Sequence, residues 1–416
     1  MKLVKKPVTG MKDILPEEMA IRNEVIGKVR EVYGRFGFTE IETPIVEHIE
    51  NLSSNQGGEN EKLIFRILKR GEKLKLDNVK DSSDLTDSGL RYDLTLPLSR
   101  FFAANMNELP MPFKALQLGN VFRADRPQRG RFRQFMQCDI DILGDGSILA
   151  ETELILATTA LLNEVGFSGF TVRISDRRIL HAMADYSGFR AETHDNLFII
   201  LDKMDKIGIE GVKEELLKAG YAEEGVDKCL SLFSLCTEGS ISNLELLSGK
   251  LGDSLDGAVL SSLKGIMENV DKVRGDGFEL KFDPTLVRGM GYYTGTIFEI
   301  EAMEFGSSIA GGGRYDGMVG KFLGQEVPSC GLSIGFERII TILLEKGYDA
   351  RTQEEKTAFL LEKKLSGERL SDIMKEAMDL RKGGKTVLVT YMAKNKKFQK
   401  EKLKQEGYSD IKEFFD

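Results

Sequence analysis

The sequence predicts an α+β protein with a helical insertion domain and a small C-terminal α/β unit. Strand-like runs occur up to residue 175 and resume at Phe278, whereas the stretch between them is helical and rich in Leu, Lys, Glu and Asp. Beyond Lys346, a strand, a glycine-capped helix, a second strand and a lysine-rich helix follow one another. We therefore predict one domain from residues 1–175 and 276–345, an inserted domain at 176–275, and a third at 354–416.

The N-terminal elements follow from periodicity and from proline positions. Glu17–Phe36 is predicted to be a helix, because apolar residues recur at helical spacing after Pro16, a residue that suits a helix start. Residues 37–48 predict a turn and then a strand that Pro44 interrupts, since proline cannot donate to a sheet. Residues 84–98 predict a short strand before a helix that starts near Pro97.

A hairpin is predicted within the most informative part of the chain. Leu116–Phe122 and Gln134–Leu143 are typical strands, and a loop punctuated by Pro127 and Gly130 joins them. The second strand alternates, so that three polar residues share one face. This hairpin favours binding of a small zwitterion beside a polyphosphate, because arginine matches phosphate oxygens and a strand carboxylate can hold a cation. The alternative is a solvated basic turn. The arginines are Arg123, Arg126, Arg129, Arg131 and Arg133, and the polar face is Gln137, Asp139 and Asp141.

Composition excludes several classes of protein. The 416 residues suit two or three domains, and no apolar run reaches the ~20 residues that cross a bilayer. Three histidines, and four cysteines without CxxC spacing, favour neither a metal centre nor a disulfide framework, so metal ligands stay unassigned. We expect a cytoplasmic protein. The formal charge of −8 argues against nonspecific coating of nucleic acid. The lysine-rich stretch Lys394–Lys404 is either a solvated helix face or a contact to phosphates.

Three further clusters are candidates for chemistry, and the sequence contains no Walker motif and no GxGxxG after a strand. In LRYDLT, Asp93 and Thr95 would point the same way on a strand and suit an ammonium group. In RGMGYY (residues 288–293), glycines would let the backbone approach a ligand. AGGGRYDG (310–317) and GLSIGFERI (331–339) come next, and in the latter Glu337 and Arg338 stand in the first turn of a helix, an anion-binding position. The alternatives are a surface strand, plain turn chemistry and a buried βα turn.

Taken together, these clusters resemble the class II aminoacyl-tRNA synthetases, and among them the histidyl-tRNA synthetase family. ETPIVE is similar to the first class motif, FRADRPQRGRFRQFMQCDIDILG to the second and GLSIGFERI to the third. LVRGMGYYTGTIFE and AGGGRYDG resemble the two signatures specific to histidine. The resemblance covers residues 8–345. It implies an antiparallel sheet flanked by helices, a homodimer with Pro44 at its interface, and L-histidine, ATP and tRNA(His) as substrates, with Mg²⁺ accompanying ATP.

The resemblance also implies a role for each matching residue. Asp93, Thr95 and Gln137 would hold the α-ammonium group of histidine. Asp141 and Tyr293 would contact the imidazole, with Tyr292 beside them in the histidine site. Arg123, Arg131 and Arg338 would bind ATP, and Arg288 would lie between the substrate carboxylate and the α-phosphate. Arg288 and Arg123 would be the catalytic residues.

The chain departs from the family pattern at three places. Gly291 stands where an aspartate is frequent, Asp141 stands where many bacterial relatives have glutamate, and the strands expected after the lysine-rich helix are not predicted here. The shortened C-terminus keeps two alternatives open. One is a histidine-sensing regulatory subunit of ATP phosphoribosyltransferase, and the other is an enzyme that adenylates histidine without using tRNA. The retained arginines favour an enzyme.

Overall fold

The computed structural model describes residues 3–56, 60–77, 79–275, 277–287, 292–302, 306–348, 350 and 356–416. The chain forms two compact units, Met1–Lys346 and Gly347–Asp416. The two units have separate sheets and separate buried cores.

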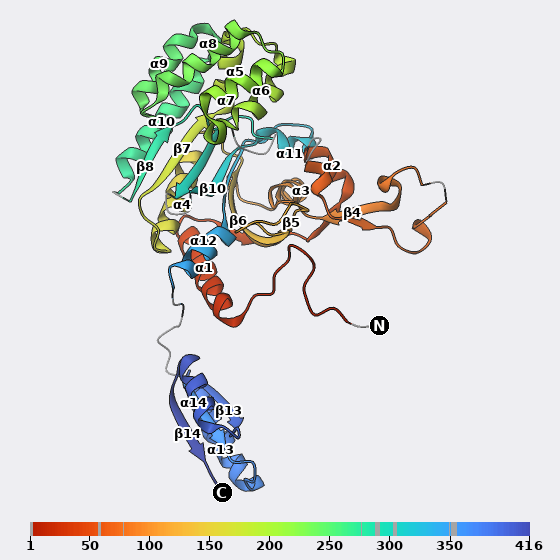
Figure 1. Cartoon of the computed structure of the whole chain (residues 1–416), viewed down its shortest axis with the longest axis vertical. Coiled ribbons are helices and arrows are strands. Elements are labelled where there is room, and N and C mark those ends of the chain that lie inside the picture. The colour runs from red at the N-terminus through yellow and green to blue at the C-terminus, as the bar shows by residue number, and fades with distance from the viewer. Residues whose placement is uncertain are drawn as a thin grey trace. The chain divides into compact units, whose positions relative to one another are not determined.

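An eight-stranded sheet forms the centre of the first unit (Figure 1). Its strands are β1 (Thr39–Ile41), β5 (Phe113–Phe122), β6 (Gln134–Leu143), β7 (Phe170–Asp176), β8 (Phe278–Phe282), β9 (Thr296–Ala302), β10 (Ser307–Arg314) and β11 (Ser329–Ile334). They are ordered β1-β5-β6-β11-β10-β9-β7-β8. The inner pairs are antiparallel, and only β1 and β8 at the edges run parallel to their neighbours. The predicted α+β class with a largely antiparallel sheet is confirmed.

The predicted hairpin is present as β5 and β6, which pair from Phe113 with Leu143 to Phe122 with Gln134. Strand β5 begins three residues before the predicted Leu116. Phe113 and Ala115 extend it because both are buried in the cluster that Leu98 of α3 (Thr95–Asn105) also joins. The register places Gly119 opposite Gln137.

Helices and a small second sheet surround this framework. Helix α1 (Pro16–Arg35) matches the prediction and packs on α4 (Leu149–Glu164) and α12 (Phe336–Glu345), whereas α3 packs on α11 (Asp316–Leu323). Pro44 lies where the chain leaves β1 for the small sheet, which consists of β2 (Val46–His48), β4 (Thr86–Leu90) and β3 (Arg66–Leu68) beside α2 (Ile49–Gln56).

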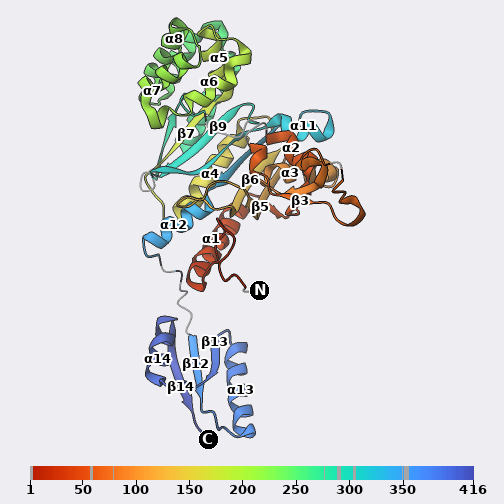
Figure 2. The ribbon, with the colours of Figure 1, turned by 45° about the vertical axis from the view of Figure 1, so that its right-hand side comes forward.

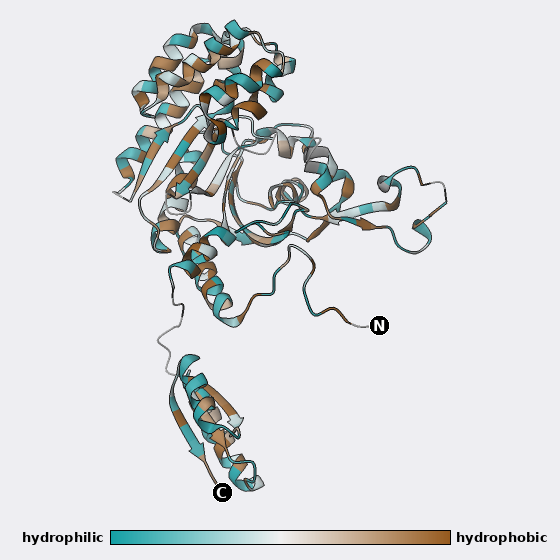
Figure 3. Ribbon diagram, in the orientation of Figure 1, coloured by the Kyte–Doolittle hydropathy of each residue, from teal (hydrophilic) through white to brown (hydrophobic). Residues whose placement is uncertain are grey.

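The stretch between β7 and β8 is helical and gathers at one end of the unit (Figure 1). Figure 3 shows hydrophobic and hydrophilic residues together on these helices, as expected for helices that bury one face. They are α5 (Arg177–Tyr186), α6 (His194–Leu201), α7 (Met204–Lys218), α8 (Glu223–Phe233), α9 (Ile241–Leu251) and α10 (Gly257–Val273). Short 3₁₀ turns lie at Asn60–Leu63, Gly71–Lys73, Ser82–Leu85, Ala191–Thr193, Ser234–Cys236 and Gly252–Ser254.

The second unit is a three-stranded parallel sheet with one helix on each face (Figure 2). Ile373 packs on the face of Phe359, and Leu403 packs on the opposite face with Ala358. The absence of a strand after the lysine-rich helix was a wrong prediction, because β14 pairs with β12. Its apolar residues are only half-buried, so their pattern was weak in the sequence. The elements are β12 (Lys356–Leu361), α13 (Gly367–Lys382), β13 (Thr386–Tyr391), α14 (Lys396–Gln405) and β14 (Tyr408–Phe414).

Among the residues that the structure describes, no helix combines the length and the apolar character that crossing a membrane requires.

Candidate active site

Two adjoining cavities open on the face of the sheet around β6, β10 and β11. The first measures about 200 Å³ and the second about 270 Å³. We call the first the arginine cavity, because Arg123, Arg131 and Arg338 line it, and the second the carboxylate cavity, because Asp93, Asp139 and Asp141 line it. The cavities share a wall of four residues, which are Arg123, Gln137, Gly311 and Ser333.

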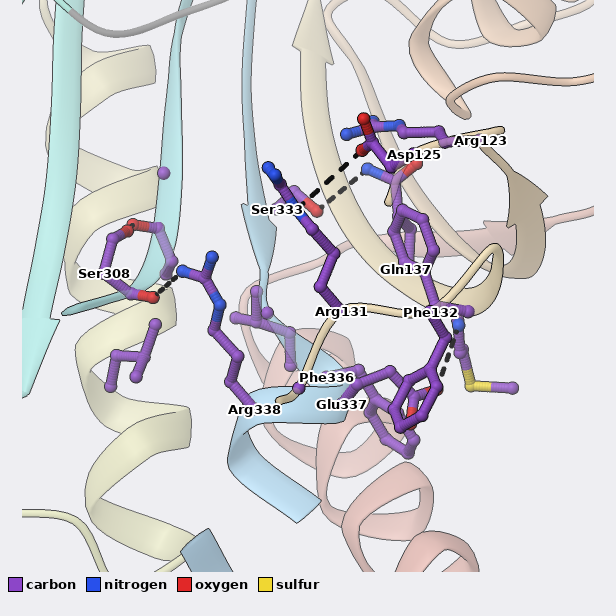
Figure 4. A pocket seen from close by; sticks show the side chains of 18 residues that line it. Arg123, Asp125, Arg131, Phe132, Gln137, Ser308, Ser333, Phe336, Glu337 and Arg338 are labelled. Atoms are coloured by element: carbon purple, nitrogen blue, oxygen red, sulfur yellow. Dashed lines mark hydrogen bonds and ion pairs between the residues drawn. The ribbon is translucent and has the colours of Figure 1, made fainter. Parts of the chain in front are cut away.

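The arginine cavity brings together cations from two distant parts of the sequence, the β5–β6 connection and α12 (Figure 4). The Arg123 guanidinium lies 4.3 Å from the Tyr92 ring centroid, and its Nε donates to Tyr92 O at 3.0 Å. Arg131 comes from the β5–β6 loop, with Nε 3.8 Å from Asp125 Oδ2. Arg338, in the first turn of α12, donates to the Ser308 carbonyl. A cavity lined in this way suits a polyanion, because a helix N-terminus adds its own positive end.

Glu337 also stands in that first turn, and a buried ion pair neutralises its charge. Arg22 of α1 donates to both Glu337 oxygens at 2.7 Å, and Glu337 Oε1 accepts from Met136 N at 3.2 Å. The carboxylate therefore joins α1, α12 and β6. Its negative charge is balanced by Arg22, which leaves Arg338 as the cation that α12 presents to the cavity.

The predicted polar face of β6 lies in the carboxylate cavity. Asp141 is 2% exposed, and its Oδ1 accepts a 2.6 Å hydrogen bond from the Tyr315 hydroxyl. Gly331 of β11 pairs with Asp141, and a Cβ at that position would collide with the same Oδ1. Glycine is therefore required at residue 331, because only glycine leaves room for the carboxylate.

The buried carboxylates have strongly perturbed proton affinities. Burial raises the pKa of Asp141 to about 7, and nearby Asp93 adds to the increase while the Tyr315 hydrogen bond opposes it. Burial, followed by repulsion from Asp141, also raises the pKa of Asp139 well above its ordinary value. Three buried acceptor atoms of residues that line the carboxylate cavity have no hydrogen-bond partner within the described part of the chain, namely Gln137 Oε1, Asp139 Oδ1 and Asp141 Oδ2. Such a set fits a ligand rich in N–H donors.

Asp93 and Thr95 line the carboxylate cavity, but the prediction that they lie on a strand was wrong. Strand β4 ends at Leu90 and α3 begins at Thr95. Asp93 Oδ1 accepts from Leu96 N at 3.1 Å, and this bond holds the turn that starts the helix. A helix start, not strand alternation, therefore brings both side chains to the cavity.

Tyr292 and Tyr293 lie in the carboxylate cavity with their ring centroids 5.0 Å apart. Burial raises the pKa of both phenols, which keeps them neutral hydrogen-bond donors at ordinary pH. The predicted catalytic Arg288 and the departure at Gly291 lie outside the described residues. The residue before this gap, Val287, accepts a hydrogen bond from Arg177 Nη1 at 3.2 Å.

Sequence reasoning assigned no role to several residues of these cavities. Asp139 could have been found, because it shares the period-two face of Gln137 and Asp141. Tyr315 stands inside AGGGRYDG, although nothing in the sequence indicates its partner Asp141. Its neighbour Arg314 forms a buried ion pair with Glu151, with N–O distances of 2.7 and 2.8 Å.

No group of three or more His, Cys, Asp or Glu side chains is arranged to hold a metal ion within the described ranges.

An antiparallel sheet flanked by helices, with an arginine cavity beside a carboxylate cavity, defines the class of the protein as a class II aminoacyl-tRNA synthetase. Residues 10–339 match the model of the family described as histidyl-tRNA synthetase. This chain therefore belongs to the histidyl-tRNA synthetase family.

Two relatives support this assignment. The chain is 46% identical over 346 residues to the histidine–tRNA ligase of Leifsonia xyli subsp. xyli, which covers 81% of this chain and 80% of the relative. It is 38% identical over 364 residues to the histidine–tRNA ligase of Christiangramia forsetii, covering 84% and 79% respectively. Such relatives are ATP-dependent aminoacyl-tRNA synthetases, and the chain is an enzyme of this kind.

Solved structures share the fold. Histidyl-tRNA synthetase from Nostoc sp. PCC 7120 superposes with a TM-score of 0.79 at 28% identity, covering 98% of this chain and 90% of that one. A protein described as an ATP phosphoribosyltransferase regulatory subunit/histidyl-tRNA synthetase, from Bacillus halodurans, also gives 0.79 with 99% of each chain covered. Its identity of 23% supports the fold alone.

Proposed function

We propose that the chain activates L-histidine with ATP to histidyl-adenylate and transfers the histidyl group to tRNA(His). The observation that carries this proposal is the wall shared by the two cavities. An amino acid in the carboxylate cavity and a nucleotide in the arginine cavity would meet at Arg123 and Gln137. Adenylation needs this juxtaposition, because the substrate carboxylate must reach the α-phosphorus.

Histidine is the amino acid that the carboxylate cavity suits. Its α-ammonium group would be held by Asp93, Thr95 and Gln137, and its imidazole by Asp141 and Tyr293, with Tyr292 alongside. The buried acceptors without a partner support this assignment, since histidine supplies N–H donors to them. A site built in this way discriminates well, because a residue without an imidazole would leave buried polar groups unpaired.

ATP would occupy the arginine cavity, with Arg123, Arg131 and Arg338 on its phosphates. A carboxylate oxygen of histidine forms a bond to the α-phosphorus while the bond to the leaving pyrophosphate oxygen breaks. Catalysis would rest on positioning and on neutralising the developing charge, which we assign to Arg123 and Arg288. Mg²⁺ would enter with ATP, as is usual for polyphosphates.

The remaining parts of the proposal follow from the family. We propose a cytoplasmic homodimer with Pro44 near the subunit interface. We also propose a catalytic domain of residues 1–175 and 276–345, an inserted domain of 176–275, and an anticodon-binding-like domain of 354–416.

Two assays test the proposed function. In the first, pyrophosphate exchange into ATP should depend on L-histidine. An absence of exchange would contradict adenylation and favour a histidine-sensing regulatory subunit. In the second, tRNA(His) should accept labelled histidine. Exchange without charging would instead identify an enzyme that adenylates histidine without tRNA.

A further inference from the structure

The segment Thr9–Lys12, which begins in a turn that Met11 N closes onto Val8 O, lies against the loop that carries Arg131. Arg133, at the end of this loop, donates from its backbone N to Gly10 O at 2.7 Å and from Nη1 to Thr9 O at 3.3 Å. The Arg133 Nε donates to Asp125 O at 3.1 Å, so the same side chain holds the start of the loop as well. The segment and the loop are therefore joined, although more than a hundred positions separate them in sequence.

Gly10 makes this contact possible. Its φ is +84°, which side chains with a Cβ rarely adopt. A Cβ built on Gly10 would lie 2.7 Å from Arg133 Cδ and 2.9 Å from Pro127 Cγ. Any other residue would have to push the loop away or give up the hydrogen bond to Arg133. The position therefore requires glycine for two independent reasons.

The other end of the segment is anchored both to the loop and to helix α1. Lys12 Nζ lies 5.9 Å from the Phe132 ring centroid and 2.5 Å from Glu18 of α1. Helix α1 also carries Arg22, whose buried ion pair holds Glu337 in α12. The segment thus connects the loop that bears Arg131 with α1, and α1 in turn is joined to α12 by the Arg22–Glu337 pair.

Besides the segment, side chains of the loop itself hold it: Arg131 and Arg133 reach Asp125, and Arg129 pairs with Glu345 of α12 at 2.5 Å. The structure describes residues 124–133 completely, and its only regular pairing there is the bridge between Gln128 and Arg131. At its base, Arg123 N donates to Arg133 O at 2.9 Å. Gly130, Arg131 and Phe132 all line the cavity, so any movement of the loop changes how far Arg131 reaches.

We infer that Gly10 is a positioning residue for ATP, because the segment Thr9–Lys12 holds the loop where Arg131 can contact the polyphosphate. The inference rests on the proposed function, which assigns ATP to the arginine cavity. Gly10 lines neither cavity and acts through Pro127 and Arg133.

The test compares Gly10→Ala with Gly71→Ala in histidine-dependent pyrophosphate exchange. Gly71 is a matched control, because its φ is +58° and nothing lies within 4 Å of a Cβ built there. For Gly10→Ala, we expect the KM for ATP to rise on the order of tenfold or more. The KM for histidine should stay within about twofold of the wild-type value, because the carboxylate cavity does not depend on the loop. The control should leave both KM values unchanged.

A double variant separates positioning from a general loss of stability. Arg133→Ala removes the main collision partner, so the rise in KM for ATP in Gly10→Ala/Arg133→Ala should be smaller than the product of the two single effects. A purely multiplicative effect would overturn the inference, as would equal rises in both KM values or a Gly10→Ala enzyme that behaves like the control. If the wild-type chain shows no exchange at all, the proposed function fails instead.

Discussion

Tyr315 and Asp141, 174 positions apart in sequence, form a buried 2.6 Å hydrogen bond in which the phenol donates to Oδ1. The bond occupies one carboxylate oxygen and leaves Oδ2 without a described partner in the cavity. Tyr315 therefore sets both the orientation of Asp141 and its charge, because a donor to the ionised form favours ionisation.

Removing the Tyr315 hydroxyl should weaken histidine binding. Tyr315→Phe raises the pKa of Asp141 further above about 7, so less of the carboxylate is ionised at neutral pH. Hydrogen bonds to charged groups contribute about 1.5–3 kcal/mol, which predicts a rise in the KM for histidine on the order of ten- to a hundredfold. Pyrophosphate exchange at varied histidine concentration measures this effect.

Tyr221→Phe is the matched control for this variant. Its hydroxyl donates a 2.7 Å hydrogen bond to Thr193 O, outside both cavities. If the two phenylalanine variants shift the KM for histidine equally, the Tyr315–Asp141 bond has no role in binding.

Asp141→Asn should stabilise the free protein at high pH while impairing histidine binding. The pKa of an aspartate in the unfolded chain is near 3.8, but the pKa of Asp141 in the folded protein is about 7. Between these values the folded state binds more protons, so the free energy of unfolding falls as pH rises. Asparagine cannot ionise, so this fall in the free energy of unfolding is absent from Asp141→Asn. Above pH 7 its free energy of unfolding should therefore exceed that of the wild type by on the order of 4 kcal/mol.

Denaturant unfolding at pH 4 and pH 8 checks the sign of this effect. The wild type and Asp141→Asn should have nearly equal free energies of unfolding at pH 4, and Asp141→Asn should have the larger one at pH 8. The exposed Asp253→Asn should change the free energy of unfolding by no more than about 0.5 kcal/mol. An Asp141→Asn chain that is less stable than the wild type at pH 8 would contradict the raised pKa.

Arg288→Ala should reduce pyrophosphate exchange on the order of 10²–10³-fold, the usual loss for one preorganised donor. This prediction rests on the sequence, since Arg288 lies outside the described residues. Arg35→Ala, which removes a half-exposed arginine from α1, should leave exchange unchanged. Near-normal exchange in Arg288→Ala would remove the arginine from the proposed mechanism.

The lysines of α14 should contribute to tRNA affinity. Lys397 and Lys404 are exposed on this helix. Each phosphate contact that is lost should weaken tRNA binding and reduce the slope of the logarithm of the binding constant against the logarithm of salt concentration by about one unit. We expect Lys397→Gln/Lys404→Gln to raise the KM for tRNA(His) several-fold at fixed salt. Lys382→Gln, on α13, serves as the control. Equal KM values in the two variants would identify α14 as a solvated helix face.

Much of the fold was predictable because local patterns coincide with it. The helix after Pro16 and the strand Gln134–Leu143 follow from periodicity alone, and the polar face of β6 follows from strand alternation. Strand β14 was missed because its apolar residues are only half-buried at a sheet edge.

Site residues that share one strand or helix could be predicted from the sequence. Residues that only tertiary contacts bring together could not. The alternation of β6 brings Gln137 and Asp141 to one cavity. Nothing local indicates that Tyr315 contacts Asp141, or that Gly10 packs on Arg133, because each pair is joined only when the chain folds. Asp93 and Thr95 were correctly grouped, but the helix start of α3 overrode the predicted strand.

The shared wall of the two cavities has a consequence for inhibitor design. A single molecule with an imidazole at one end and adenosine at the other would extend from the carboxylate cavity into the arginine cavity. It loses its rigid-body freedom once on binding, whereas histidine and ATP lose theirs separately. Binding at one end also raises the effective concentration of the other end, to the millimolar range for short linkers. A stable linked compound should therefore bind far more tightly than either substrate, and a change at Gln137 or Arg123 should weaken both of its ends together.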